Sequence, residues 1–133
     1  MKKALMIIGG ILVLLYIAAI FVPFDPEERQ PGTRLSGELA DPQDTDWSFL
    51  DPKGNRLYVE TRSLYLIPHS ITVNGWVTDG ILYVGCRNCD EKYWPKNVAR
   101  DQRIRLKAQG KIYERTAIRT DNDGRTVFRM DPR

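Results

Sequence analysis

The sequence has few residues of the kinds that build metal centres and nucleophilic active sites. Its 133 residues include two cysteines and one histidine, so a four-ligand zinc site would need unusual partners. The GxSxG, HExxH and P-loop patterns do not occur in it. The sequence therefore leaves little room for metal or nucleophile chemistry.

The chain also lacks a strong excess of one charge. Its net charge is +3, and Lys2 and Lys3 supply two of those positive charges. The remainder is close to neutral and gives no case for nucleic acid as a partner. Residues 25–91 carry six Lys/Arg and twelve Asp/Glu, whereas residues 92–133 carry twelve and five. Solvated strand faces explain the basic half most simply, and a basic cleft for an anionic ligand such as phosphate is the sharper hypothesis.

One long apolar run is present at the N-terminus. Residues 4–24 are uncharged and rich in Ile, Leu, Val and Ala, and as a helix they would span ~30 Å, the thickness of a bilayer core. We predict that residues 1–24 are an uncleaved transmembrane signal anchor. A cleaved signal peptide is the alternative, with a cleavage site near residues 17–19, but the apolar run is long for that class and continues past the site.

The charges that flank the apolar run predict its orientation. Lys2, Lys3 and the amino terminus outweigh Arg29 and Arg34 on the other side, so the positive-inside rule places the N-terminus in the cytoplasm. We therefore expect a single-pass protein of the inner cell membrane, with its C-terminal domain in the periplasm or outside the cell.

Composition divides the rest of the chain in two. Residues 25–46 are polar, acidic and punctuated by three prolines, which predicts an extended linker lying along the domain or the membrane surface. Core-type residues begin at Trp47. We therefore assign residues 47–133 to one folded domain.

Two β-hairpins are predicted in this domain. Strand-forming residues at 71–84 are interrupted by Asp-Gly at 79–80, and those at 103–114 by Gln-Gly at 109–110. Such pairs suit two-residue turns, which need positive φ at both central positions. In the second hairpin apolar and basic residues alternate, which predicts one buried and one basic face: Ile104, Leu106 and Ala108 against Arg103, Arg105 and Lys107.

The region before the first hairpin predicts one further strand. Residues 57–61 alternate, with Leu57 and Val59 expected to face inward. The apolar residues 64–67 end at a proline, which predicts a bend or an edge strand. His69 follows that proline, where a hydrogen-bonded structural histidine is commoner than a catalytic one.

A short helix is predicted at residues 94–101, with Pro95 in its first turn. From this helix into the second hairpin, the sequence resembles the split β-barrel flavin and deazaflavin proteins, and more narrowly the deazaflavin-dependent nitroreductase family. That family has the pattern W-x-x-N-L-x-x-N-P-x-V. The residues that fit it are Trp94, Asn97, Val98, Asp101 and Ile104.

The resemblance implies a fold and a set of cofactor contacts. The fold would be mainly β with one short helix, a split β-barrel domain preceded by a single transmembrane helix. The cofactor would be FMN or a deazaflavin, although the residues by themselves identify none. The implied contacts are Lys92, Trp94 and Asn97, near the cofactor phosphate in that family, and the cations that would neutralise it are Arg87, Arg103 and Arg105.

The two cysteines form a CxxC at Cys86 and Cys89. The surrounding hairpins do not match the βαβ setting of a thioredoxin motif. In an extracytoplasmic domain a local structural disulfide is expected. A redox-active pair catalysing thiol–disulfide exchange is the lesser alternative.

Two main hypotheses for function follow. The first is a membrane-anchored binding or accessory subunit of a membrane protein complex, in contact with the bilayer and with a membrane-protein partner or a second copy of itself. It rests on the anchor, the small size and the absence of the family's upstream Gly-Arg-Lys-type segment, in whose place residues 61–64 stand. The second is a flavin- or deazaflavin-dependent oxidoreductase of the nitroreductase or quinone-reductase kind, working at the membrane surface.

Overall fold

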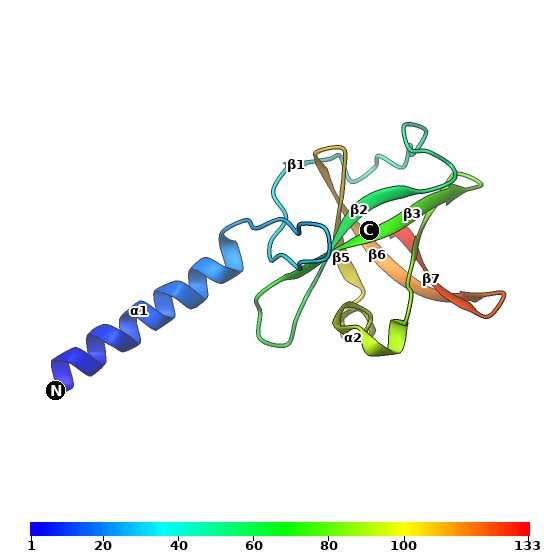
Figure 1. Ribbon diagram of the computed structural model, residues 1–133. Coiled ribbons are helices and arrows are strands. Elements are labelled where there is room, and N and C mark those ends of the chain that lie inside the picture. The colour runs from blue at the N-terminus through cyan, green and yellow to red at the C-terminus, as the bar shows by residue number, and fades with distance from the viewer.

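The computed structural model describes residues 1–133, without the side chain of Asn122. An apolar helix, α1 (Lys2–Phe21), projects from a β-domain that carries one further α-helix, α2 (Tyr93–Arg100) (Figure 1). A 3₁₀ turn, η1 (Cys89–Glu91), precedes α2. The strands are β1 (Glu38–Leu39), β2 (Asn55–Thr61), β3 (His69–Thr78), β4 (Ile81–Gly85), β5 (Arg103–Ala108), β6 (Lys111–Asn122) and β7 (Arg125–Pro132).

Six of the strands close into a barrel. β2, β3 and β4 form one antiparallel meander, and β5, β6 and β7 form another. The meanders join where β2 pairs with β5 and where β4 pairs with β7, both antiparallel. The short strand β1 pairs in parallel with β6. The predicted fold class, a mainly β barrel preceded by one apolar helix, is confirmed.

Two-residue turns connect β3 to β4, β5 to β6 and β6 to β7. The predicted turns at 79–80 and 109–110 are both present, and a third lies at 123–124. Positive φ at both central residues matches the right-handed twist of the flanking strands. The six angles are 53° and 76° for Asp79 and Gly80, 48° and 81° for Gln109 and Gly110, and 50° and 75° for Asp123 and Gly124.

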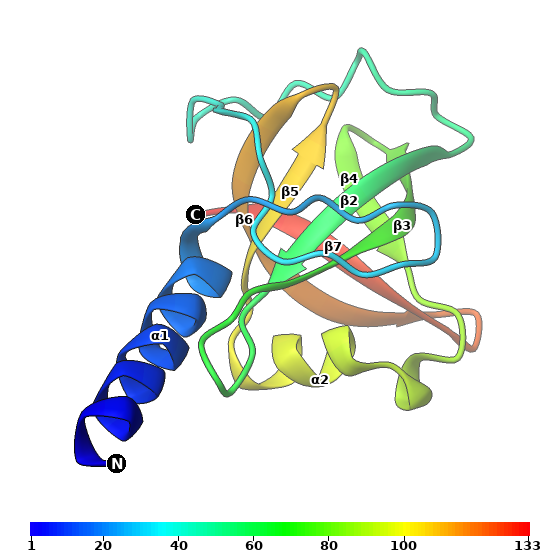
Figure 2. The same ribbon diagram turned by 60° about the vertical axis from the view of Figure 1, so that its left-hand side comes forward.

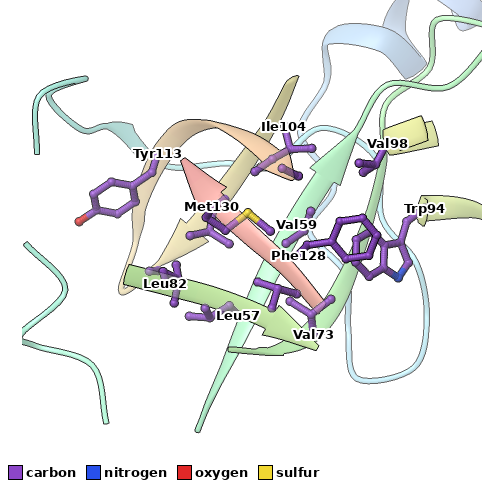
Figure 3. Close-up of a cluster of buried hydrophobic side chains, with 14 of the residues drawn as sticks. Leu57, Val59, Val73, Leu82, Trp94, Val98, Ile104, Tyr113, Phe128 and Met130 are labelled. Carbon is purple, nitrogen blue, oxygen red and sulfur yellow. The ribbon is translucent and has the colours of Figure 1, made fainter. Parts of the chain in front are cut away.

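The core fills the inside of the barrel with residues from alternate strand positions. Leu57, Val59 and Ile104 point inward as predicted (Figure 3). Leu106 is buried in the same core. Helix α2 closes one end of the barrel. Its Trp94 is 2% exposed and packs on Phe128 of β7 with ring centroids 4.7 Å apart. Burying aromatic side chains of this size is a large part of what stabilises a small barrel.

Residues 23–36, which follow α1, run across the outer face of the sheet and then back again (Figure 2). We call these residues the strap. Gly32 and Ser70 of β3 exchange backbone hydrogen bonds of 2.8 and 3.0 Å. Only glycine fits at position 32, because a Cβ there would overlap the Phe24 carbonyl. Leu35 is 2% exposed. The strap therefore holds the end of α1 close to the domain.

Candidate functional site

An open groove of about 1280 Å³ lies on one side of the barrel. It lies where β4 ends at Gly85 and the chain leaves the sheet for η1 and α2. The groove is lined by residues 28–31 of the strap, by Arg56, by residues 85–87 and 89–94, and by Gly124 with the first three residues of β7. From β3 it is lined by His69, Ile71, Thr72, Val73, Asn74 and Trp76.

One edge of β3 is open inside this groove. β3 pairs with β2 from His69 to Gly75, but with β4 only from Gly75 onward. The strap covers the free edge at Ser70. Residues 71–74 therefore have a neighbouring strand on the β2 side and none on the other, within the part of the chain that the structure describes. An uncovered edge of this kind is a template for pairing with another extended segment.

Cations gather around the groove from separate parts of the chain. Five of them line it, against three carboxylates, Glu28, Asp90 and Glu91. Among the described side chains, none of the five lies within 4.0 Å of a carboxylate oxygen. Unpaired cations in a concave site attract anionic groups. They are Arg29, Arg56, Arg87, Lys92 and Arg125.

The β3 wall of the groove also carries hydrogen-bonding groups without partners. Thr72 lines the groove, and its buried hydroxyl makes no hydrogen bond within the described structure. His69 is half-buried, and burial lowers the pKa of its imidazole below the ordinary value of 6.5. His69 is therefore neutral at pH 7, and its ring adds hydrogen-bonding capacity rather than charge.

Three of the six predicted cofactor-contact residues line this groove. Arg87 and Lys92 are exposed at its rim. Trp94 borders it but is almost wholly buried in the packing of α2 on β7. Cys86 and Cys89 also line the groove and are joined by a disulfide, with their Cα atoms 5.2 Å apart. The disulfide closes the loop that carries Arg87.

Asn97 lies outside the groove and ties α2 to the barrel. Its side-chain amide donates a 3.0 Å hydrogen bond to the Thr61 hydroxyl, which donates at 3.2 Å to the His69 carbonyl. The Arg100 guanidinium donates to the remaining side-chain oxygen of Asn97. Asn97 is 5% exposed. Its role in this arrangement is to fix α2 against β2 and β3 beside the groove wall.

The remaining two predicted contacts lie on the outer face of β5, away from the groove. Arg103 forms two 3.0 Å hydrogen bonds with Asp101, and Arg105 lies 2.9 Å from Glu60. The hydrogen bonds from Arg103 are the main cause that lowers the pKa of the Asp101 carboxyl group. The nearby positive charges lower it further. The predicted alternation of buried apolar and outward-facing basic residues along β5 is confirmed. However, a carboxylate neutralises the charge of each of these two arginines.

Sequence reasoning did not find the open edge of β3 or the cations Arg29, Arg56 and Arg125. These cations come from the strap, β2 and β7, so no local motif joins them. One signal was available. In the sequence, strand-forming residues run over 71–78 before the Asp-Gly pair but only over 81–84 after it, and a hairpin with unequal arms leaves part of the longer strand unpaired.

A scan against protein-family models, a search of curated proteins and a search of solved structures each find no match to this chain. The resemblance to the flavin and deazaflavin proteins thus remains a prediction. No three His, Cys, Asp or Glu side chains are grouped to hold a metal ion in the part of the chain that the structure describes. The arrangement at the groove, with an open strand edge and free cations, is suited to binding.

Proposed function

We propose that this protein is a single-pass membrane-anchored binding module. In this proposal α1 crosses the bilayer, and the groove takes an extended, acidic segment of a partner in a membrane protein complex. The observation that carries the proposal is the open edge of β3 inside a groove with unpaired cations. A strand added at such an edge gains main-chain hydrogen bonds, and charge complementarity selects its sequence.

The properties of α1 support the membrane anchor. The helix has 20 residues and contains an 18-residue window with a mean hydropathy of 2.8, which is long and apolar enough to cross a membrane. None of its residues is buried against the barrel. An apolar surface of this size in water would be strongly unfavourable, and a bilayer removes it from water.

Two features support an extracytoplasmic barrel. Lys2 and Lys3 stand at the free end of α1, and cytoplasmic flanks of membrane spans are rich in such residues. The Cys86–Cys89 disulfide suits an oxidising compartment such as the periplasm.

The experiment is site-specific photo-crosslinking in the native membrane. A photo-reactive residue at Thr72, on the groove wall, is expected to give a discrete adduct with one partner. The same residue at Lys53, an exposed position outside the groove, is the matched control and is expected to give none. Reversing the charges at Arg87 and Arg125 should weaken the Thr72 adduct. Failure to form an adduct at Thr72, or equal adducts at both positions, would reject the proposal.

A second candidate is the flavin- or deazaflavin-dependent oxidoreductase. It is favoured because Arg87 and Lys92 line the same groove as Trp76 and Tyr93, and such a set offers cations to a phosphate and aromatic faces to a ring system. Absorbance spectra of the purified protein, with FMN titrated in, separate the two candidates. Saturable FMN binding that R87E/K92E abolishes would favour the oxidoreductase, and a colourless protein with no saturable binding would reject it.

A further inference from the structure

The turn between β2 and β3 exposes three consecutive large apolar side chains. We call residues 64–66 the apolar turn. Leu64 is 78% exposed, Tyr65 59% and Leu66 68%. Apart from the apolar turn, α1 and the residues directly after α1, the described chain exposes large apolar side chains only singly. A contiguous exposed group is unusual and marks an interaction surface.

The apolar turn lies beside the C-terminal part of α1. The hydroxyl of Tyr16 donates a hydrogen bond to the carbonyl of Tyr65, and both views show the β2–β3 turn alongside the last turns of the helix (Figures 1 and 2). Tyr16 stands five residues before Phe21, so it lies about 7.5 Å from that end of the helix. The apolar turn is therefore level with a part of α1 that belongs to the bilayer if the helix spans it.

The backbone of the turn keeps these side chains outside. Leu66 has a φ of 70°, a left-handed conformation that is rare and strained for a bulky residue. The turn is closed by a hydrogen bond from the Leu66 amide to the Ser63 carbonyl at 3.4 Å and by one from the Ser63 hydroxyl to the Ile67 carbonyl. Glycine or asparagine would adopt this conformation at lower cost. A leucine at this place exposes apolar surface where a turn normally carries polar residues.

We propose that the apolar turn inserts into the interfacial zone of the bilayer as a second membrane contact next to α1. The inference rests on the membrane anchor in the proposed function. The occupant is the lipid, because the apolar turn is in direct contact with α1 and continues the apolar surface of that helix. Leucine side chains gain free energy by leaving water, and a tyrosine ring suits the membrane–water interface.

A second contact has a mechanical consequence. One helix alone leaves the barrel free to rotate about the helix axis and to tilt. Contacts at both α1 and the apolar turn fix one side of the barrel toward the lipid. The groove then keeps one orientation relative to the membrane, which reduces the entropy cost of binding a partner in that membrane.

The test is lipid quenching of a fluorophore attached to single introduced cysteines. Full-length protein is reconstituted into vesicles of phosphatidylethanolamine and phosphatidylglycerol that carry spin-labelled acyl chains. The labelled variants are L12C in α1, L66C in the apolar turn and K53C in the turn before β2. Labels at positions 12 and 66 are expected to be quenched and blue-shifted, whereas the label at 53 stays in water.

The three positions separate the possible failures. Quenching at position 12 without quenching at 66 overturns the second contact and leaves the anchor in place. Absence of quenching at 12 overturns the anchor and the proposed function together. In a further arm, a label at Tyr65 is compared with and without L64S/L66S. These substitutions should remove the quenching and leave thermal unfolding in detergent unchanged, since both side chains are exposed. Retained quenching would contradict the proposal.

Discussion

The Lys107 ammonium group on β5 lies 2.5 Å from a carboxylate oxygen of Asp25, four residues after the end of α1. The same carboxylate accepts hydrogen bonds from the backbone amide and hydroxyl of Ser36 at 2.7 and 3.1 Å. Both partners are largely shielded from water, with exposed side-chain fractions of 18% and 25%. This contact joins the two ends of the strap to the barrel next to α1.

We predict that K107M loosens the strap and lowers the free energy of unfolding by about 1 kcal/mol, the range of a partly shielded ion pair. K111M removes an exposed lysine that is not paired with a carboxylate among the described side chains, and it should change the free energy little. Denaturant unfolding measures both. Faster proteolysis within residues 23–36 in K107M, but not in K111M, would locate the change in the strap.

The pH dependence of this contact has a defined sign. Burial by itself raises the pKa of Asp25, but the hydrogen bonds from Lys107 and Ser36 outweigh burial and bring the pKa below the ordinary value of 3.8. The stabilisation is therefore complete above pH 3.8 and is lost as the pH falls through the lower value of the folded state. Proteolysis of the strap should increase only below about pH 4. In K107M the hydrogen bonds from Ser36 remain, so the pH dependence of strap proteolysis should be weaker than in the parent, and an equal dependence would contradict this account.

His69 should make the barrel less stable in mild acid. Burial lowers the pKa of its imidazole below 6.5 in the folded state, so the unfolded chain takes up a proton first as the pH falls. Stability is therefore highest above pH 6.5 and declines below it. H69Q is expected to flatten thermal unfolding profiles between about pH 5 and pH 7. An unchanged slope in H69Q would show that other groups cause the decline.

The Cys86–Cys89 disulfide should stabilise the groove loop modestly. Its loop is short, with a sequence separation of three, so loop-closure entropy gives about 2 kcal/mol. C86S/C89S is expected to lose about that amount in denaturant unfolding. Two free thiols in the native protein would contradict the assignment, and so would equal stability of the double variant and the parent.

Arg115 should be essential for packing at one end of the barrel. Its side chain is 1% exposed, and its guanidinium lies 5.4 Å from the ring centre of Trp47 and 5.3 Å from that of Tyr113. It donates hydrogen bonds to the carbonyls of Asp44 and, at 2.8 Å, Glu114. R115A should lose about 3 kcal/mol, because the cavity and the lost hydrogen bonds add.

R115M is the matched variant for Arg115, because methionine keeps much of the apolar contact with the two rings and removes the charge. A smaller loss in R115M than in R115A, measured by denaturant unfolding, would show that apolar packing carries much of the effect. Equal losses would assign the effect to the guanidinium hydrogen bonds with the chain at Asp44 and Glu114.

The amino-acid sequence by itself determines the helices and hairpins of this protein, because the features that specify them are local. Positive φ at two-residue turns, alternation in β5 and the position of Pro95 each act over a few residues. They suffice to predict the hairpins, α2 and the inward faces of the strands. The apolar character of α1 likewise needs no tertiary contact.

The groove and its charges were decided by the tertiary structure alone. Arg105 meets Glu60 across 45 residues of chain, and Lys107 meets Asp25 across 82. Which cations stay free depends on such contacts. Alternation along β5 therefore predicted cations that carboxylates compensate in the fold, whereas Arg29, Arg56 and Arg125 of the groove were not predicted. The open edge of β3 likewise exists because the chain leaves the sheet after Gly85. Strand pairing is a non-local choice, and the energies that make it come from barrel closure and core packing.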